Sequence, residues 1–189
     1  MNQHHALPQL PSLFLVGGTG RFVGKTTFAE LLIEHFSKDF TIIAVKISNI
    51  KPGDQAVHGW HGDALTERFL IEEETSSGNQ KDTQRFLAAG AKQAFFIRAY
   101  EEALPEAVTA FFEQISPNTL LVCESNTLRN YYNPGAMVMV TDEEKPISKA
   151  ESIELLEKAD VVVKHFDKVA FKKVIDGVGI TGNKWSITR

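Results

Sequence analysis

Glycine and lysine residues near the N-terminus have the types and spacing that a phosphate group requires. Residues 17–27 read GGTGRFVGKTT. Glycines let the backbone curl closely, so that several N–H groups converge on one anion. Lys25 adds a full positive charge, and the hydroxyl of Thr26 can serve as a ligand for Mg²⁺. The segment predicts a loop that binds the phosphates of a nucleoside triphosphate.

The predicted nucleotide-binding residues all belong to this loop. They are Gly18, Thr19, Gly20, Val23, Gly24, Lys25, Thr26 and Thr27. The usual motif is G-x-x-x-x-G-K-S/T, whereas here the five residues 19–23 separate Gly18 from Gly24. The loop is therefore one residue longer than the standard form. The alternative is a chance Gly-Lys-Thr that opens an ordinary helix.

Two acidic residues downstream are candidates for metal binding and catalysis. Glu124 ends the apolar run 119–124, and a buried parallel strand there would bring it beside the loop. We expect it to reach Mg²⁺ directly or through water, with a solvent-facing carboxylate as the alternative. Asp82 is a second candidate for metal or water, or else a simple helix cap. Lys25, Asp82 and Glu124 form the predicted catalytic set, and Thr26, Glu124 and Asp82 the predicted metal ligands.

Further polar residues are placed to meet the same site. Lys46 lies near the carboxyl end of the second predicted strand, the edge at which parallel sheets bind ligands. Ser125 and Asn126 follow Glu124 and could contact phosphate or substrate. Arg85 could pair with phosphate or with Asp82, and a surface salt bridge is its alternative.

Two other sequence patterns concern metal binding and the recognition of the nucleotide base. His58, His61 and Asp63 could bind zinc or nickel, although solvated loop histidines are the more common case. Residues 164–167 read KHFD, and only Asp167 fits the Asn-Lys-x-Asp pattern that selects guanine. These residues therefore leave GTP and ATP both open.

Alternating strands and helices must position these side chains. Apolar runs predict strands at 12–16, 40–47, 93–98, 119–124, 136–140 and 160–164. Helical patterns follow the loop and recur at 82–89, 102–115 and 148–158. The polar stretch 48–80 is expected to be a long excursion with one helix near 63–73, and the last 20 or so residues are ambiguous. The alternation predicts a three-layer α/β/α fold around a mostly parallel sheet.

Composition restricts the class of protein. The 189 residues carry a net charge of -4, so no general basic field attracts nucleic acid or anionic lipid. No run approaches a membrane span of roughly 20 apolar residues. One cysteine excludes an intramolecular disulfide. We expect a cytoplasmic protein with a flexible lead-in at 1–11 and one nucleotide-binding domain at 12–189.

Two families resemble parts of this chain. The loop is similar to the Gly-Thr-Asp-Thr-x-Val-Gly-Lys-Thr loop of dethiobiotin synthetases at Gly18, Thr19, Val23, Gly24, Lys25 and Thr26. Residues 82–85, followed by 89–91, resemble the Asp-Ser/Thr-x-Arg…Ala-Gly-Ala element of the molybdopterin-guanine dinucleotide biosynthesis protein B family. Both families belong to the SIMIBI class of P-loop NTPases.

The resemblance implies three functions. The first is Mg²⁺-dependent GTP binding with slow hydrolysis, in support of molybdopterin-type cofactor biosynthesis. The second is an ATP-dependent ligase or kinase of small molecules, like dethiobiotin synthetase. The third is a nucleotide-gated chaperone for nickel or zinc. The resemblance also implies a second small-molecule or cofactor ligand and a homodimer.

Overall fold

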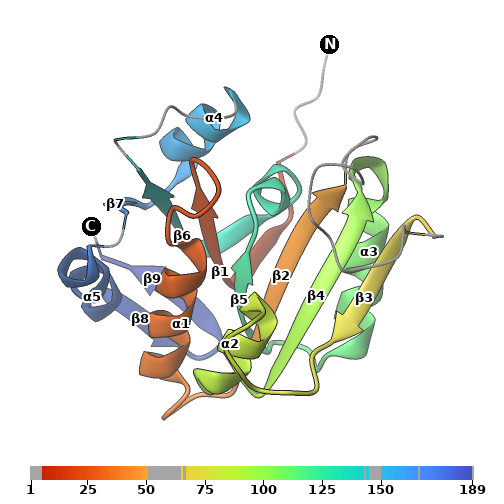
Figure 1. Ribbon diagram of the computed structural model, residues 1–189, viewed down its shortest axis with the longest axis horizontal. Coiled ribbons are helices and arrows are strands. Elements are labelled where there is room, and N and C mark those ends of the chain that lie inside the picture. The colour runs from red at the N-terminus through yellow and green to blue at the C-terminus, as the bar shows by residue number, and fades with distance from the viewer. Residues whose placement is uncertain are drawn as a thin grey trace.

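The computed structural model describes residues 6–50, 65, 67–142, 144, 150–165 and 167–188. A central sheet runs through this part of the chain, with helices on both of its faces (Figure 1). The predicted three-layer α/β/α fold with a mostly parallel sheet is confirmed.

The strands and helices alternate along most of the chain. The strands are β1 (Gln9–Gly18), β2 (Ile42–Ile50), β3 (Phe69–Glu73), β4 (Gln93–Tyr100), β5 (Leu120–Glu124), β6 (Asn133–Thr141), β7 (Val161–Lys164), β8 (Val178–Thr181) and β9 (Lys184–Ile187). The α-helices are α1 (Lys25–Phe36), α2 (Asp82–Ala88), α3 (Leu104–Gln114), α4 (Ala150–Lys158) and α5 (Lys168–Asp176). In the described part of the chain, the short 3-10 helices η2 (Glu101–Ala103) and η3 (Thr127–Asn130) precede α3 and β6.

The strand order brings the predicted site residues to one edge of the sheet. In the described residues the order is β3-β4-β2-β5-β1-β6-β7. All neighbouring pairs are parallel except β3 and β4, which are antiparallel. Since β5 lies between β1 and β2, its last residue Glu124 is in register with Val16 on one side and Lys46 on the other. The carboxyl ends of these three strands therefore meet beside the loop.

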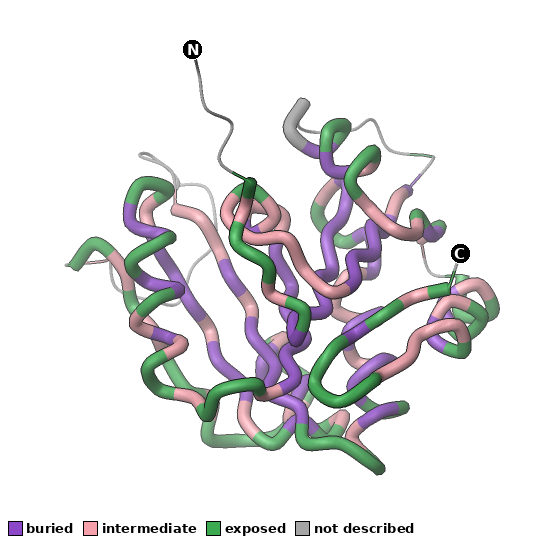
Figure 2. Tube along the Cα trace, turned by 180° about the vertical axis from the view of Figure 1, so that it is seen from behind, coloured by how far each residue is buried: buried purple, intermediate pink, exposed green. Residues whose placement is uncertain are grey.

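Apolar side chains on the two faces of the sheet form two core clusters. On one face, Phe28 of α1, Phe86 of α2 and Phe171 of α5 pack with the sheet and are fully buried. On the other face, Leu104 and Phe111 of α3 pack with residues such as Leu15 and Ile97. Figure 2 shows the buried residues following the central strands. This double cover explains why the strands read as continuous apolar runs.

The structure differs from the sequence-based predictions in two segments. The helix expected near 63–73 was wrong over Phe69–Glu73, which forms the antiparallel edge strand β3; residues 51–64 and 66 lie outside the described part. Strand β1 begins at Gln9 instead of residue 12, so Gln9–Pro11 belong to the sheet.

The ambiguous C-terminal segment forms α5 and the β8–β9 hairpin. Trp185 of β9 is buried and packs edge-on against Phe14 of β1 and Phe36 of α1, with ring centroids 5.4 and 5.2 Å apart. The hairpin thus closes the core beneath the strand and the helix that flank the loop.

Candidate functional site

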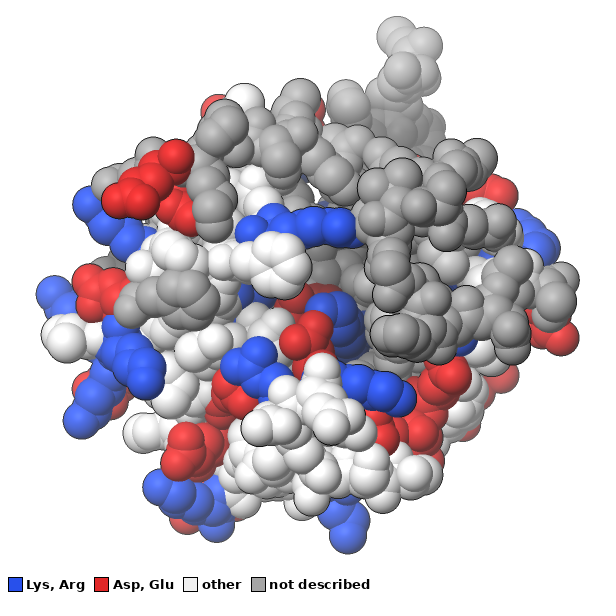
Figure 3. Space-filling view, viewed as in Figure 1, with Lys and Arg blue, Asp and Glu red and all other residues white. Residues whose placement is uncertain are grey.

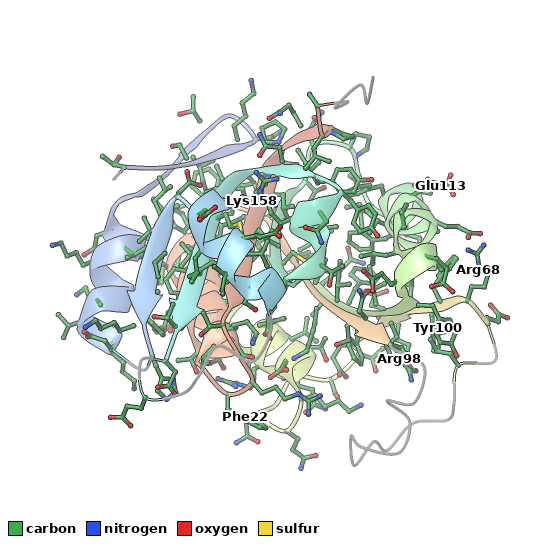
Figure 4. The ribbon with its side chains drawn as sticks, turned by 90° about the horizontal axis from the view of Figure 1, so that it is seen from above. Phe22, Arg68, Arg98, Tyr100, Glu113 and Lys158 are labelled. Atoms are coloured by element: carbon green, nitrogen blue, oxygen red, sulfur yellow. The ribbon has the colours of Figure 1, made fainter. Side chains whose placement is uncertain are left out.

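The loop between β1 and α1 turns sharply on both sides of Val23. Phe22 and Gly24 have left-handed φ values of 57° and 99°. Between them Val23 is buried in the core, while the side chain of Phe22 is 84% exposed. Figure 4 shows Phe22 at the margin of the molecule, on the side that carries α1 and α2. Val23 thus anchors the loop in the core, while the ring of Phe22 stays outside it.

The start of the loop is held by Asn126. Its Oδ1 accepts a hydrogen bond from Gly18 N (2.8 Å), and its Nδ2 donates to Gly18 O (2.8 Å). A Cβ on Gly18 would lie only 2.7 Å from Cγ2 of Val23, so only glycine fits without a shift. Asn126, which could contact phosphate or substrate, thus fixes the backbone at the start of the loop through one acceptor and one donor of its amide.

Lys25 and Thr26 open α1 beside the acidic residues. The N–H groups of a first helical turn have no intrahelical acceptor and attract anions. Lys25 Nζ donates to Gly20 O (2.7 Å), and Thr26 Oγ1 donates to Oε2 of Glu124 (2.7 Å). Burial lowers the pKa of Lys25, and the charge of Glu124 offsets this only in part. The loop, the helix start and Glu124 form one connected group.

Lys46 joins the two acidic candidates. Its Nζ forms an ion pair with Asp82 and lies 3.4 Å from Oε1 of Glu124. Burial by itself would lower the pKa of Lys46, but the charges of Glu124 and Asp82 outweigh burial and raise it. Asp82 therefore faces the site from the first turn of α2. Figure 3 shows acidic and basic side chains together around a hollow near the middle of this face.

Arg85 forms an ion pair between two helices. Its Nε donates to Oε1 of Glu30 in α1 (2.9 Å), and its Nη2 donates to Thr27 Oγ1 (3.2 Å). Asp82 is farther away, at 3.9 Å. The hydrogen bond to Glu30 raises the pKa of Arg85, despite some burial. The partner Glu30 was not predicted, because its place on the polar face of a helix gives no sign of what it meets.

The remaining candidates have structural roles or lie elsewhere. Ser125 is buried, and its Oγ accepts from Leu128 N (3.2 Å). Asp167 caps α5 through Ala170 N (2.9 Å). His58, His61 and Asp63 lie outside the described residues. Within the described ranges, no group of three or more His, Cys, Asp and Glu residues gathers as a metal site, and no helix is long and apolar enough to cross a bilayer.

No protein-family model and no curated protein sequence matches the chain. One solved structure that aligns is LpxK from Aquifex aeolicus in complex with ATP. The alignment has 14% identity and a TM-score of 0.48, and covers 87% of this chain and 50% of LpxK. This chain thus spans about half the length of that protein. Because the sequence identity and the TM-score are this low, the ligand and the activity are inferred from the residues of the site.

Proposed function

We propose that the chain binds a magnesium nucleoside triphosphate, with the phosphates on the loop from Gly18 to Thr27. The observation that carries the proposal is the hydrogen bond from Thr26 to Glu124, formed beside Lys25 at the start of α1. This bond joins the sequence motif to an acid that lies 98 residues farther along the chain. A chance Gly-Lys-Thr at a helix start would not require a buried carboxylate on its threonine.

The site offers side-chain oxygen atoms of the kind that bind Mg²⁺. This hard cation takes oxygen ligands, and in phosphate sites it uses one or two carboxylates together with phosphate oxygens. Thr26 and Glu124 would hold it, with Asp82 as a further carboxylate on the same side of the sheet. When bound, the metal would neutralise charge on the phosphates.

Catalysis would consist of positioning and electrostatics. Phosphoryl transfer asks little covalent chemistry of the protein. Lys25 would stabilise charge on the β- and γ-phosphates, and Glu124 would position the metal or a water molecule. Residues 82–85 and 89–91 resemble the molybdopterin-guanine dinucleotide biosynthesis protein B family. This resemblance supports a more specific proposal, namely slow GTP hydrolysis during molybdopterin-type cofactor biosynthesis.

A second candidate function is ATP-dependent transfer to a small molecule. It is favoured by Lys46, whose ammonium lies at the carboxyl edge of the sheet and is partly exposed. Such a cation could hold an acidic acceptor beside the phosphates. Affinities for GTP and ATP, each measured by calorimetry with Mg²⁺, separate the two: preference for GTP favours the cofactor role, and preference for ATP favours transfer.

The variant Lys25→Ala tests nucleotide binding itself. We expect it to abolish binding of both nucleotides while the far-UV circular dichroism spectrum stays unchanged, because the side chain contributes charge rather than core packing. The matched control is Lys92→Ala, which removes an exposed lysine just before the amino end of β4, away from the carboxyl edge of the sheet. Undiminished calorimetric binding by Lys25→Ala would refute the proposed function.

A further inference from the structure

Lys46 contacts the oxygen atoms that a divalent cation would need. Its Nζ meets Asp82 and Oε1 of Glu124, while the other oxygen of Glu124 accepts from Thr26. We propose that Lys46 competes with Mg²⁺ for these carboxylates, so that the lysine must release them before a metal nucleotide is bound. The proposal rests on the function proposed above, since it takes Thr26 and Glu124 to belong to a magnesium site.

The two lysines of the site differ in their partners. Lys25 donates to a carbonyl of its own loop, Gly20 O. Lys46 comes from β2, in register with Glu124, and spans the gap from the sheet to Asp82 on α2. The carboxylates thus have a resident counter-ion that comes from outside the phosphate-binding loop.

The side chain of Lys46 is able to leave. Its exposed fraction is 24%, and that of Asp82 is 30%, so the ion pair opens toward solvent. An ammonium on a flexible four-carbon stem can move without a shift of the backbone. A divalent cation beside an unmoved ammonium would meet like-charge repulsion in a partly buried site. Departure of Lys46 relieves this repulsion and frees its charge for an anionic group at the same edge.

Manganese binding without nucleotide tests the competition. Mn²⁺ is titrated into the full chain and followed by electron paramagnetic resonance. We expect Lys46→Gln to bind Mn²⁺ at least about tenfold more tightly than the unaltered protein, because the competing ion pair is gone. Lys92→Gln removes the same charge from an exposed lysine outside the site and leaves the carboxylates paired, and we expect a change below about twofold.

Two results would overturn the proposal. If Lys46→Gln and the control variant gained the same factor in Mn²⁺ affinity, the gain would be a general effect of charge. If Lys46→Gln bound Mn²⁺ no more tightly than the unaltered protein, Lys46 would not compete with the metal. Nucleotide is absent from this comparison, so its outcome is independent of whether Lys25→Ala loses nucleotide binding.

A second measurement uses the unaltered protein and does not depend on the folding of a variant. Lysine acetylation is followed by mass spectrometry with and without Mn²⁺. We expect Mn²⁺ to raise the acetylation rate of Lys46 several-fold, since the released ammonium becomes accessible, and to leave Lys92 unchanged. An unchanged rate at Lys46, at a Mn²⁺ concentration that saturates the paramagnetic titration, would overturn the proposal.

Discussion

Among the residues that the structure describes, Phe22 has the least favourable backbone conformation for its type. Its left-handed φ of 57° costs about 1 kcal/mol for a residue with a Cβ, and its exposed ring gains little packing. We predict that Phe22→Gly raises the free energy of unfolding by about 0.5 kcal/mol, after allowing for the greater freedom of unfolded glycine. Urea unfolding measures the change.

Phe22→Ala is the control for this prediction. It removes the ring but keeps the Cβ, so its stability should equal or fall below that of the unaltered protein. An equal gain in both variants would mean that the ring, and not the backbone, is unfavourable.

The place of the loop between β1 and α1 could be predicted because a short local motif lies between an apolar run and a helical pattern. Glu124 could be predicted as well, since it ends an apolar run that must be a buried strand. The ion pairs of Lys46 with Asp82 and of Arg85 with Glu30 could not, because they join segments separated by 36 and 55 residues. Asn126 was placed near the site, but its two hydrogen bonds to Gly18 could not be predicted, because they also join distant segments.

At the level of elements, the ion pair between Arg85 and Glu30 connects α2 to α1. Both side chains are about one quarter exposed, so solvent screens the pair in part. We predict a coupling free energy of about 1 kcal/mol in a double-mutant cycle with Arg85→Met and Glu30→Gln, measured by urea unfolding.

The pair of Arg68 and Glu106 provides a matched comparison. Its atoms are 2.8 Å apart, but the side chains are 62% and 56% exposed. The same cycle should give a coupling near zero there. Equal couplings for both pairs would contradict the view that partial burial makes the α1–α2 contact matter.

The element that was mispredicted and the segment that was left ambiguous both lack a clear local sequence pattern. Residues Phe69–Glu73 form a strand only because β4 offers an antiparallel partner, which a local pattern does not reveal. The β8–β9 hairpin is short and contains both polar and apolar residues. Its one buried side chain, Trp185, packs against residues that are distant in the sequence. By contrast, the run 40–47 was predicted as a strand, and the structure has β2 at Ile42–Ile50, whose first four residues are buried between the two layers of helices.

For the whole molecule, Cys123 offers a measure of global opening. It is the only cysteine, lies in the central strand β5 and is 1% exposed. Burial raises the pKa of its thiol well above the ordinary value, so the native thiol is a poor nucleophile. Reaction with a disulfide reagent therefore requires the sheet to open.

Nucleotide should slow this reaction. A ligand that binds only the folded state at 100 times its dissociation constant lowers the open population by about 100-fold. We predict a matching decrease in the labelling rate at pH 8 with magnesium nucleotide, and no decrease for Lys25→Ala. Labelling that is fast and insensitive to nucleotide would mean that Cys123 is reached by local motion.

The C-terminal hairpin has a consequence for the order in which the chain folds during synthesis. Trp185 contacts Phe14 and Phe36, which lie on the strand and helix that flank the loop between Gly18 and Lys25. While residues 184–187 are still inside the ribosome, that side of the core lacks its cover. The candidate nucleotide site on that loop would therefore gain its full packing only after the hairpin has left the ribosome.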